Sequence, residues 1–209
     1  MEKKDRSERV RMTEQQRAEH NKLFEQAAAL VKEEIPLHDR RVLPKPGWWL
    51  RRKLRRALSL FERALELNPE NWSAMWLAGK VHQRLGEETT ALSWFERAYQ
   101  VNPSQPDVAR EASLLAMDVG RSDAAIVYAF RATQIEPESA GLQANLALAY
   151  LLAARVGEAQ KSIESSLSID GSDTISQTIK EIIGHFASTG RKPPAKTEDL
   201  QRYWAKLGR

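Results

Sequence analysis

The sequence predicts an all-α fold built from repeated helix pairs, and three observations predict it. The segment "SLFERALELNP" at residues 59–69 returns as "SWFERAYQVNP" at residues 93–103, with seven of eleven letters unchanged. Prolines recur in 34-residue steps, at Pro69, Pro103 and Pro137. Small residues also recur at the same 34-residue interval within the segments between these prolines. Since proline cannot continue a helix, each copy is expected to end at its proline and the next helix to start after it.

The small and aromatic residues of each copy have the spacing of one helix face. Ala91 and Ala98 are two helical turns apart with Phe95 between them, so all three are expected to face a neighbouring helix. The residues expected to pack the repeats together are Ala57, Phe61, Ala64, Pro69, Gly79, Ala91, Phe95, Ala98, Pro103, Ala125, Ala132, Pro137 and Ala159.

This pattern resembles the tetratricopeptide repeat, a 34-residue helix–turn–helix unit. The resemblance rests on Gly79 in the first helix of a unit, on Ala91 and Phe95 in its second helix, and on Pro103 at its end. It covers roughly residues 48–171. It implies a right-handed α–α superhelix, a tetratricopeptide solenoid, whose first helices line a concave groove.

The repeat step also divides the chain. We expect a flexible N-terminus at 1–12, an N-terminal capping helix with a Pro-rich connection at 13–47, and about three and a half repeat units within 48–173, at 48–71, 72–105, 106–139 and 140–173. A C-terminal capping helix is expected at 174–189, followed by a linker and a short terminal helix at 190–209. Within the complete units, helices are expected at 72–85 and 88–101, 106–119 and 122–135, and 140–153 and 156–169.

The first unit departs from the repeat. Its first helix would fall on a stretch in which Pro44, Pro46 and Gly47 prevent a regular helix. Upstream, Leu23 and Ala27 have helical spacing, and we expect their helix to pack on the open face of the first repeat helix as an irregular cap.

Composition and motifs favour a folded, non-catalytic protein. Hydrophobic residues make up 42% and charged residues 29% of the 209 residues, and there is no cysteine. The four histidines lack metal-ligand spacing, and no glycine-rich phosphate loop occurs, so no enzyme activity, metal or cofactor is expected. No apolar run reaches the roughly 20 residues of a membrane span, and the first residues lack the apolar core of a signal peptide. We expect a cytoplasmic location.

The tetratricopeptide resemblance implies a binding groove for a peptide or helix of another protein. The ligand-facing positions that it implies are Ser73, Trp76, Lys80, Gln83, Arg84, Asp107, Arg110, Leu114, Met117 and Leu148. The cations among them would favour an acidic ligand. Two alternatives to this assignment stay open. One is that Trp76 is a core residue, and the other is that the C-terminal helices cover the apolar positions around Leu148.

One known partner class of the family is not expected. Some tetratricopeptide proteins clamp the acidic C-terminal tails of chaperones with a Lys, Asn, Asn, Lys, Arg set. The five clamp positions can be placed on this chain in two ways. In the first placement none of the five residues is a cation. In the second, which is shifted by one repeat unit and ends at Asn145, Lys80 is the single cation. One cation cannot neutralise two carboxylates.

A second candidate surface is a basic patch before and within the first repeat helix. The stretch between residues 37 and 57 contains eight basic residues and one acidic residue. Its local charge is therefore +7, in a chain whose net charge is +4. The patch residues are Trp48, Trp49, Arg51, Arg52, Lys53, Arg55 and Arg56. They are typical either of an ordinary helix start, with an indole packed on the N-terminal helix and the cations in solvent, or of a surface for an acidic protein, anionic lipid or RNA.

These patterns favour a protein–protein interaction scaffold or adaptor. The alternatives are an assembly factor that docks on lipid, RNA or an acidic protein through the basic patch, and a self-associating structural domain. The partner and the oligomeric state do not follow from the sequence.

Overall fold

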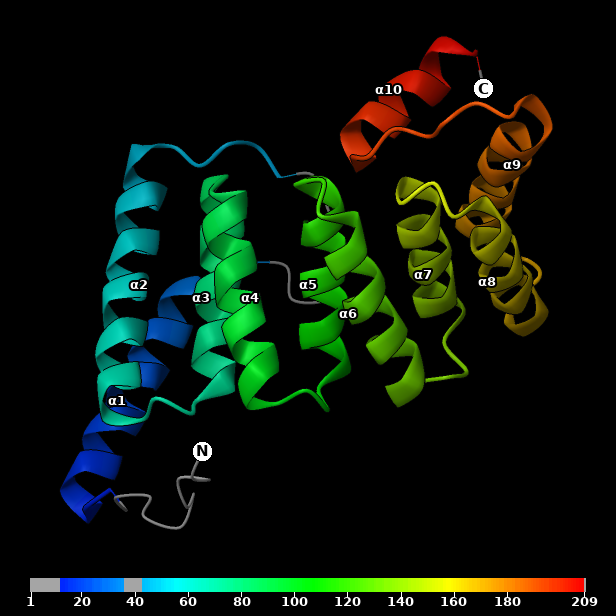
Figure 1. The fold of residues 1–209 in the computed structure, drawn as a ribbon. Helices are drawn as coiled ribbons and strands as arrows, with labels where there is room; N and C mark the ends of the chain where they lie inside the picture. The colour runs from blue at the N-terminus through cyan, green and yellow to red at the C-terminus, as the bar shows by residue number, and fades with distance from the viewer. Residues whose placement is uncertain (1–11, 36–42, 209) are drawn as a thin grey trace, which may run out of the picture. The chain divides into compact units, whose positions relative to one another are not determined.

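The computed structural model describes residues 12–35 and 43–208, and every regular element in those residues is an α-helix (Figure 1). The helices are α1 Glu14–Val31, α2 Trp48–Leu67, α3 Trp72–Leu85, α4 Glu88–Val101, α5 Pro106–Asp118, α6 Ser122–Ile135, α7 Ala140–Leu152, α8 Val156–Ile169, α9 Thr174–Thr189 and α10 Thr197–Lys206. The bounds of α3 to α8 differ from the predicted ranges by at most one residue. The predicted all-α class is therefore confirmed.

The described residues form two compact units, residues 12–35 with 43–86 and residues 87–208. The first unit holds α1 to α3, and the second holds α4 to α10.

In the first unit α2 packs against both α1 and α3. Helix α1 begins with a capping box, in which Thr13 Oγ1 accepts from the Gln16 amide while the Gln16 side chain accepts from the Thr13 amide. Ala27 and Phe61 are fully buried, and the Phe24 ring lies 6.0 Å from that of Phe61. The core of this unit therefore depends on the non-repeat helix.

A partly buried hydrogen-bond chain joins α1 to the start of α3. Asn71 Nδ2 donates to Nε2 of the buried His20 at 2.9 Å, and the other ring nitrogen, Nδ1, donates to Asn21 Oδ1 at 2.9 Å. Asn71 Oδ1 accepts from the Ala74 amide and caps α3. The Asn71 side chain thus caps the start of α3 and also bonds to α1.

In the second unit consecutive helices from α4 to α9 pack on one another, and α9 also packs on α7. Alanines permit close approach: Ala91, Ala98, Ala125, Ala132 and Ala159, all predicted to pack the repeats, have no exposed surface. The loop after α5 turns at Gly120, whose φ of +82° lies in the left-handed region that closes many helices.

Helix α10 is held to α9 by a group of aromatic rings. His185 Nε2 and the Tyr203 hydroxyl are 2.9 Å apart, and the Phe186 and Tyr203 rings stack at 5.3 Å. Leu200 and Trp204 of α10 are buried. The linker before α10 is held as well, because Ser122 Oγ lies 3.4 Å from the Ala195 carbonyl oxygen.

Among the described helices, none combines the length and the apolar character needed to cross a membrane.

Candidate functional site

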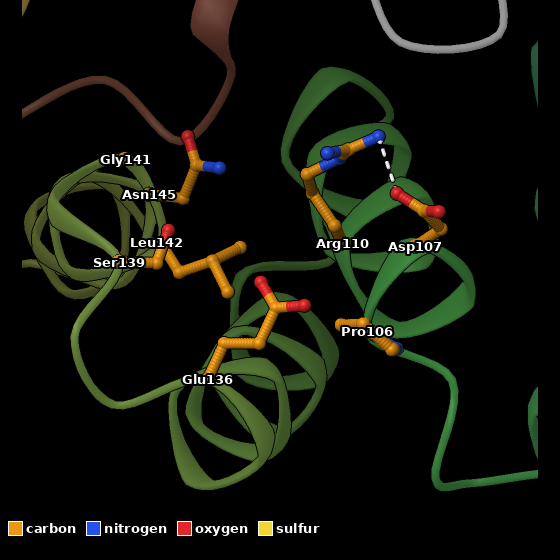
Figure 2. Close-up of a pocket in the computed structure, with 8 residues that line it drawn as sticks. All are labelled: Pro106, Asp107, Arg110, Glu136, Ser139, Gly141, Leu142 and Asn145. Carbon is orange, nitrogen blue, oxygen red and sulfur yellow. Dashed lines mark ion pairs between the residues drawn. The ribbon is translucent and has the colours of Figure 1, made fainter.

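A pocket of about 140 Å³ lies in the second unit, between α5, α7 and the connection from α6 to α7 (Figure 2). Its lining residues are Pro106, Asp107, Arg110, Glu136, Ser139, Gly141, Leu142 and Asn145. Helices α5 and α7 are the first helices of two successive repeat units. The pocket is therefore built from the first helices of neighbouring repeats together with the connection that leads into the second of them.

Arg110 is the cation of this pocket. Its Nη2 lies 2.8 Å from Asp107 Oδ1, one helical turn earlier, and 3.6 Å from Glu111 Oε1. The Arg110 and Asp107 side chains remain 27% and 38% exposed. The guanidinium is thus positioned by α5 itself and still reaches solvent.

The opposite wall carries groups that suit a peptide backbone. Asn145 on α7 is partly exposed, and its amide can both donate and accept. Gly141 is exposed and lacks a side chain, so this part of the wall is open, while the buried Leu142 forms an apolar floor. Glu136, from the connection between α6 and α7, adds a second carboxylate to the pocket lining (Figure 2).

The other groove residues predicted on α5 and α7 differ in accessibility. Leu114 and Leu148 are half-buried, whereas Met117 is 1% exposed. Leu151 and Leu152, which follow Leu148 on the apolar side of α7, are buried, and α9 packs on this helix. Which residues cover Leu148 and its neighbours therefore stays a prediction.

The groove residues predicted on α3 lie in the first unit, where they are mostly enclosed. Trp76 is 9% exposed and its buried indole Nε1 finds no hydrogen-bond acceptor within residues 12–35 and 43–208, while Lys80 is 4% exposed. Arg84 Nη1 donates to the Pro44 carbonyl oxygen at 2.9 Å. Ser73 and Gln83 are half-buried. In this structure the α3 set offers less surface than the pocket around Arg110.

The basic patch at the start of α2 separates into two faces. Lys53 Nζ pairs with Glu34 Oε1 at 2.8 Å, so this cation belongs to the contact with the segment after α1. Trp48 and Trp49 are 61% and 76% exposed, and they are not packed on α1 as one alternative expected. The four arginines, Arg51, Arg52, Arg55 and Arg56, are all exposed.

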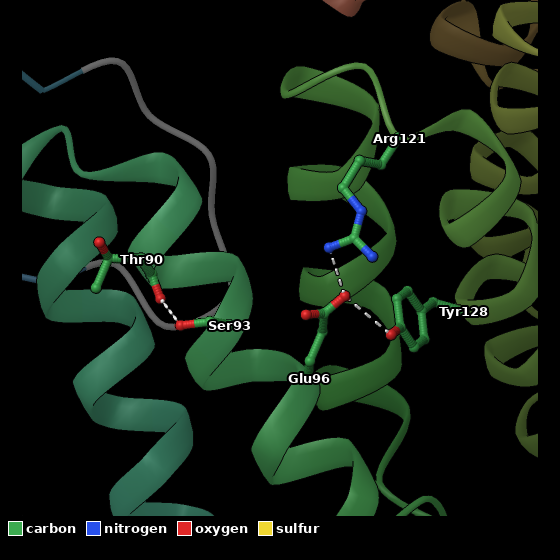
Figure 3. A network of polar contacts seen from close by, with 5 residues as sticks. All are labelled: Thr90, Ser93, Glu96, Arg121 and Tyr128. Atoms are coloured by element: carbon green, nitrogen blue, oxygen red, sulfur yellow. Dashed lines mark hydrogen bonds and ion pairs between the residues drawn. The ribbon is translucent and has the colours of Figure 1, made fainter.

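A polar network links α4 to α6 (Figure 3). The Tyr128 hydroxyl donates to Glu96 Oε1 at 3.3 Å, and Arg121 Nη1 pairs with the same oxygen at 2.9 Å. Burial, followed by the charge of Glu96, raises the pKa of Tyr128 to about 12. The phenol therefore stays protonated at neutral pH and acts as a structural donor.

Metal-binding side chains do not gather in groups of three or more anywhere in residues 12–35 or 43–208.

Sequence reasoning finds Asp107 and Arg110 but not Glu136, Ser139 or Asn145 as pocket residues. Glu136 and Ser139 lie in and beside the connection between repeats, where the helical period gives no information. Asn145 occupies a clamp position of the family, which was a usable signal, although the rest of that clamp is missing.

Comparisons with known proteins point to one repeat family. Residues 51–107 match the family model described as tetratricopeptide repeat. Among solved structures, YrrB, titled a TPR protein with an unusual peptide-binding site, is 19% identical over 64% of this chain and 69% of its own, with a TM-score of 0.55. A MamA protein is 13% identical over 89% of this chain and 90% of its own, with a TM-score of 0.64.

PilF of Pseudomonas aeruginosa is 15% identical over 84% of this chain and 72% of its own, with a TM-score of 0.59. At these identities the likeness is one of fold. No curated protein matches the sequence.

Proposed function

Because this chain is a tetratricopeptide-repeat protein, we propose that it acts as a non-catalytic scaffold or adaptor that holds a peptide or helix of a partner protein. Proteins with this fold typically bind other proteins or peptides. The binding site that we assign is the pocket between α5 and α7.

The observation that carries the proposal is the composition of this pocket. It places Arg110 and Asn145 on opposite walls, from the first helices of successive repeats, above the apolar Leu142. A peptide needs such a set: an amide for its backbone, a charged group for one side chain and an apolar floor. The described peptide-binding site of YrrB, which shares the fold, is consistent with this use.

The charges suggest which ligand side chain enters. Arg110 is already paired with Asp107, and its Nη2 also lies 3.6 Å from Glu111 Oε1, so an acidic ligand side chain would have to compete with these carboxylates for the guanidinium. A planar guanidinium can bond a further carboxylate with its remaining N–H groups. We therefore propose a ligand with one acidic residue rather than an acidic run, since Asp107 and Glu136 would repel further negative charge.

A peptide selection tests this proposal without knowledge of the natural partner. Random peptides displayed on phage are selected against the purified chain, synthesised singly and measured by fluorescence anisotropy. The test variant combines Arg110→Gln with Asn145→Ala. The matched control combines Lys161→Gln with Gln160→Ala, which removes the same charge and the same amide from exposed positions of α8.

The expected result is a Kd on the order of tenfold to a hundredfold weaker for the test variant, with the control unchanged, because a charge-assisted bond and an amide bond are lost. Selected peptides should share an acidic residue. If the peptides bind the test variant as tightly as the control, the pocket is not the binding site and the proposal is wrong.

A further inference from the structure

The start of α2 presents a surface that the pocket does not explain. Its exposed residues, here called the Trp-Arg face, are Trp48, Trp49, Arg51, Arg52, Arg55 and Arg56. Helical periodicity places them opposite the side of α2 that holds the buried Leu54, Ala57 and Phe61. The core of the first unit therefore does not require them.

The charge on this face is of one sign. Helix α2 carries no acidic side chain before Glu62, while Arg51, Arg52, Arg55 and Arg56 are exposed within its first turns. Lys53 points elsewhere and pairs with Glu34. An exposed cluster of this kind sets up a positive potential and attracts anionic surfaces.

The two indoles at the helix start are exposed although they are large and apolar. They pack on each other edge to face, with ring centroids 4.3 Å apart at 74°. The Arg52 guanidinium lies over the Trp48 ring at 5.9 Å. Exposed neighbouring aromatic residues mark a surface that another molecule covers.

We propose that the Trp-Arg face docks on the surface of an anionic phospholipid bilayer. Indole rings prefer the boundary between headgroups and acyl chains, where the ring is in an apolar layer and its N–H is hydrated. Arginines one to two turns further along the helix reach the lipid phosphates and anionic headgroups, and each adds to the attraction. The protein would bind peripherally through one helix start.

The geometry of the rings favours lipid over the other anionic partners. A single-stranded nucleic acid stacks its bases on open ring faces. Here Arg52 lies over Trp48 and Trp49 meets it at an angle, so the pair does not form a flat platform. An acidic protein segment would satisfy the arginines but would leave exposed indoles without an apolar partner, whereas a bilayer interface serves both.

Vesicle sedimentation tests the proposal. The full chain is mixed with sucrose-loaded vesicles of pure phosphatidylcholine, or of phosphatidylcholine with roughly one-third phosphatidylserine, at low and high salt. The expected result is binding to the anionic vesicles alone, weakened by salt. One test variant combines Arg52→Glu with Arg56→Glu, and a second combines Trp48→Ala with Trp49→Ala.

A matched control separates a local surface from overall charge. Lys22→Glu with Arg63→Glu reverses two exposed cations of the same unit, so its net charge equals that of the arginine variant. We expect the partition coefficient to fall at least about tenfold in the arginine variant and severalfold in the tryptophan variant, and to change little in the control. Circular dichroism checks that all variants keep their helices.

Three results would overturn the proposal. The first is no binding to anionic vesicles at low salt by the folded chain. The second is an equal loss in the control, which would reduce the effect to net charge. The third is tighter binding of oligouridylate or polyglutamate than of vesicles, which would assign the face to nucleic acid or to an acidic protein. The peptide pocket lies in the other unit, so its test stands or fails separately.

Discussion

The hydroxyl oxygens of Ser166 and Ser176 lie 2.8 Å apart in a fully buried position that joins α8 to α9. Ser166 Oγ also lies 2.8 Å from the Ala140 carbonyl oxygen, and Ser176 Oγ lies 2.5 Å from Asp173 Oδ2. In the preceding repeats the position of Ser166 is occupied by alanines. A polar link therefore replaces a plain packing residue where the last repeat meets its cap.

Ser166→Ala should lower the free energy of unfolding by about 1 kcal/mol. The alanine fits, since alanine occupies this position in the preceding repeats, but a buried hydroxyl that contacts both α7 and α9 is lost. Urea unfolding followed by circular dichroism measures the change. The control Ser165→Ala removes an exposed hydroxyl and should have little effect. A more stable Ser166→Ala protein would show that the link is not stabilising.

Asp173 should make the α9 cap sensitive to acid. The Ser176 hydroxyl, and then the backbone amides of Ser176 and Ile175, lower the pKa of Asp173 below its ordinary value of 3.8. Because the folded pKa is depressed, this stabilisation is present above pH 3.8 and is lost as the pH falls below it. At neutral pH, Asp173→Ala should cost about 1 kcal/mol as a lost helix cap.

The stability difference between wild type and Asp173→Ala should shrink when urea unfolding is repeated in increasingly acidic buffers. A difference that stays constant from neutral pH into this acid range would contradict the assigned role of the carboxylate.

Tyr128 should titrate at a higher pH than an ordinary phenol. Its raised pKa means that the folded state keeps the phenol proton longer than the unfolded state does. The contribution to stability is therefore complete below pH 10 and is lost as the pH rises through about 12. Tyrosinate absorbance during an alkaline titration should show a late-titrating phenol that is absent in Tyr128→Phe.

Glu96→Gln provides the control for the cause of this shift. It removes the negative charge but leaves the phenol buried, so the pKa of Tyr128 should fall part of the way toward 10. An unchanged titration would exclude Glu96 as a cause.

Ala154→Gly should stabilise the protein by about 1 kcal/mol. Ala154 has φ of +60° at the position where the preceding repeats have Gly86 and Gly120, with φ of +80° and +82°. A side chain in this left-handed region is strained, and glycine removes the strain. Thermal or urea unfolding measures the gain. Ala153→Gly, one residue earlier at a φ of −84°, should instead destabilise, and stabilisation by both changes would refute the explanation.

The positions of the helices follow closely from the sequence because a 34-residue step repeats at several positions and proline ends each copy. The periodicity assigns α3 to α8 to within one residue at either end. The tetratricopeptide resemblance also predicts Asp107 and Arg110 as residues of one site. The role of that site in binding stays a prediction.

Contacts between residues that are not related by the repeat could not be predicted in the same way. In the sequence Lys53 looks like one more cation of the basic patch. That Lys53 pairs with Glu34 becomes clear only from where the segment after α1 lies in the structure. Glu136 enters the pocket through the geometry of a connection, which helical periodicity does not describe. The enclosure of Lys80 depends on its surroundings in the folded unit and not on its position in the repeat.

The packing of α9 has a consequence for how such a chain lengthens during evolution. In the interior of the second unit, α7 covers α6, while the corresponding face of α8 is covered by α9, which is not a repeat helix. A duplicated 34-residue block appended after α9 would find no matching surface. The same block inserted between existing repeats would meet alanines in phase on both sides and would leave the Ser166–Ser176 link intact. We therefore expect an in-phase duplication to be accommodated more readily within the repeat region than after α9.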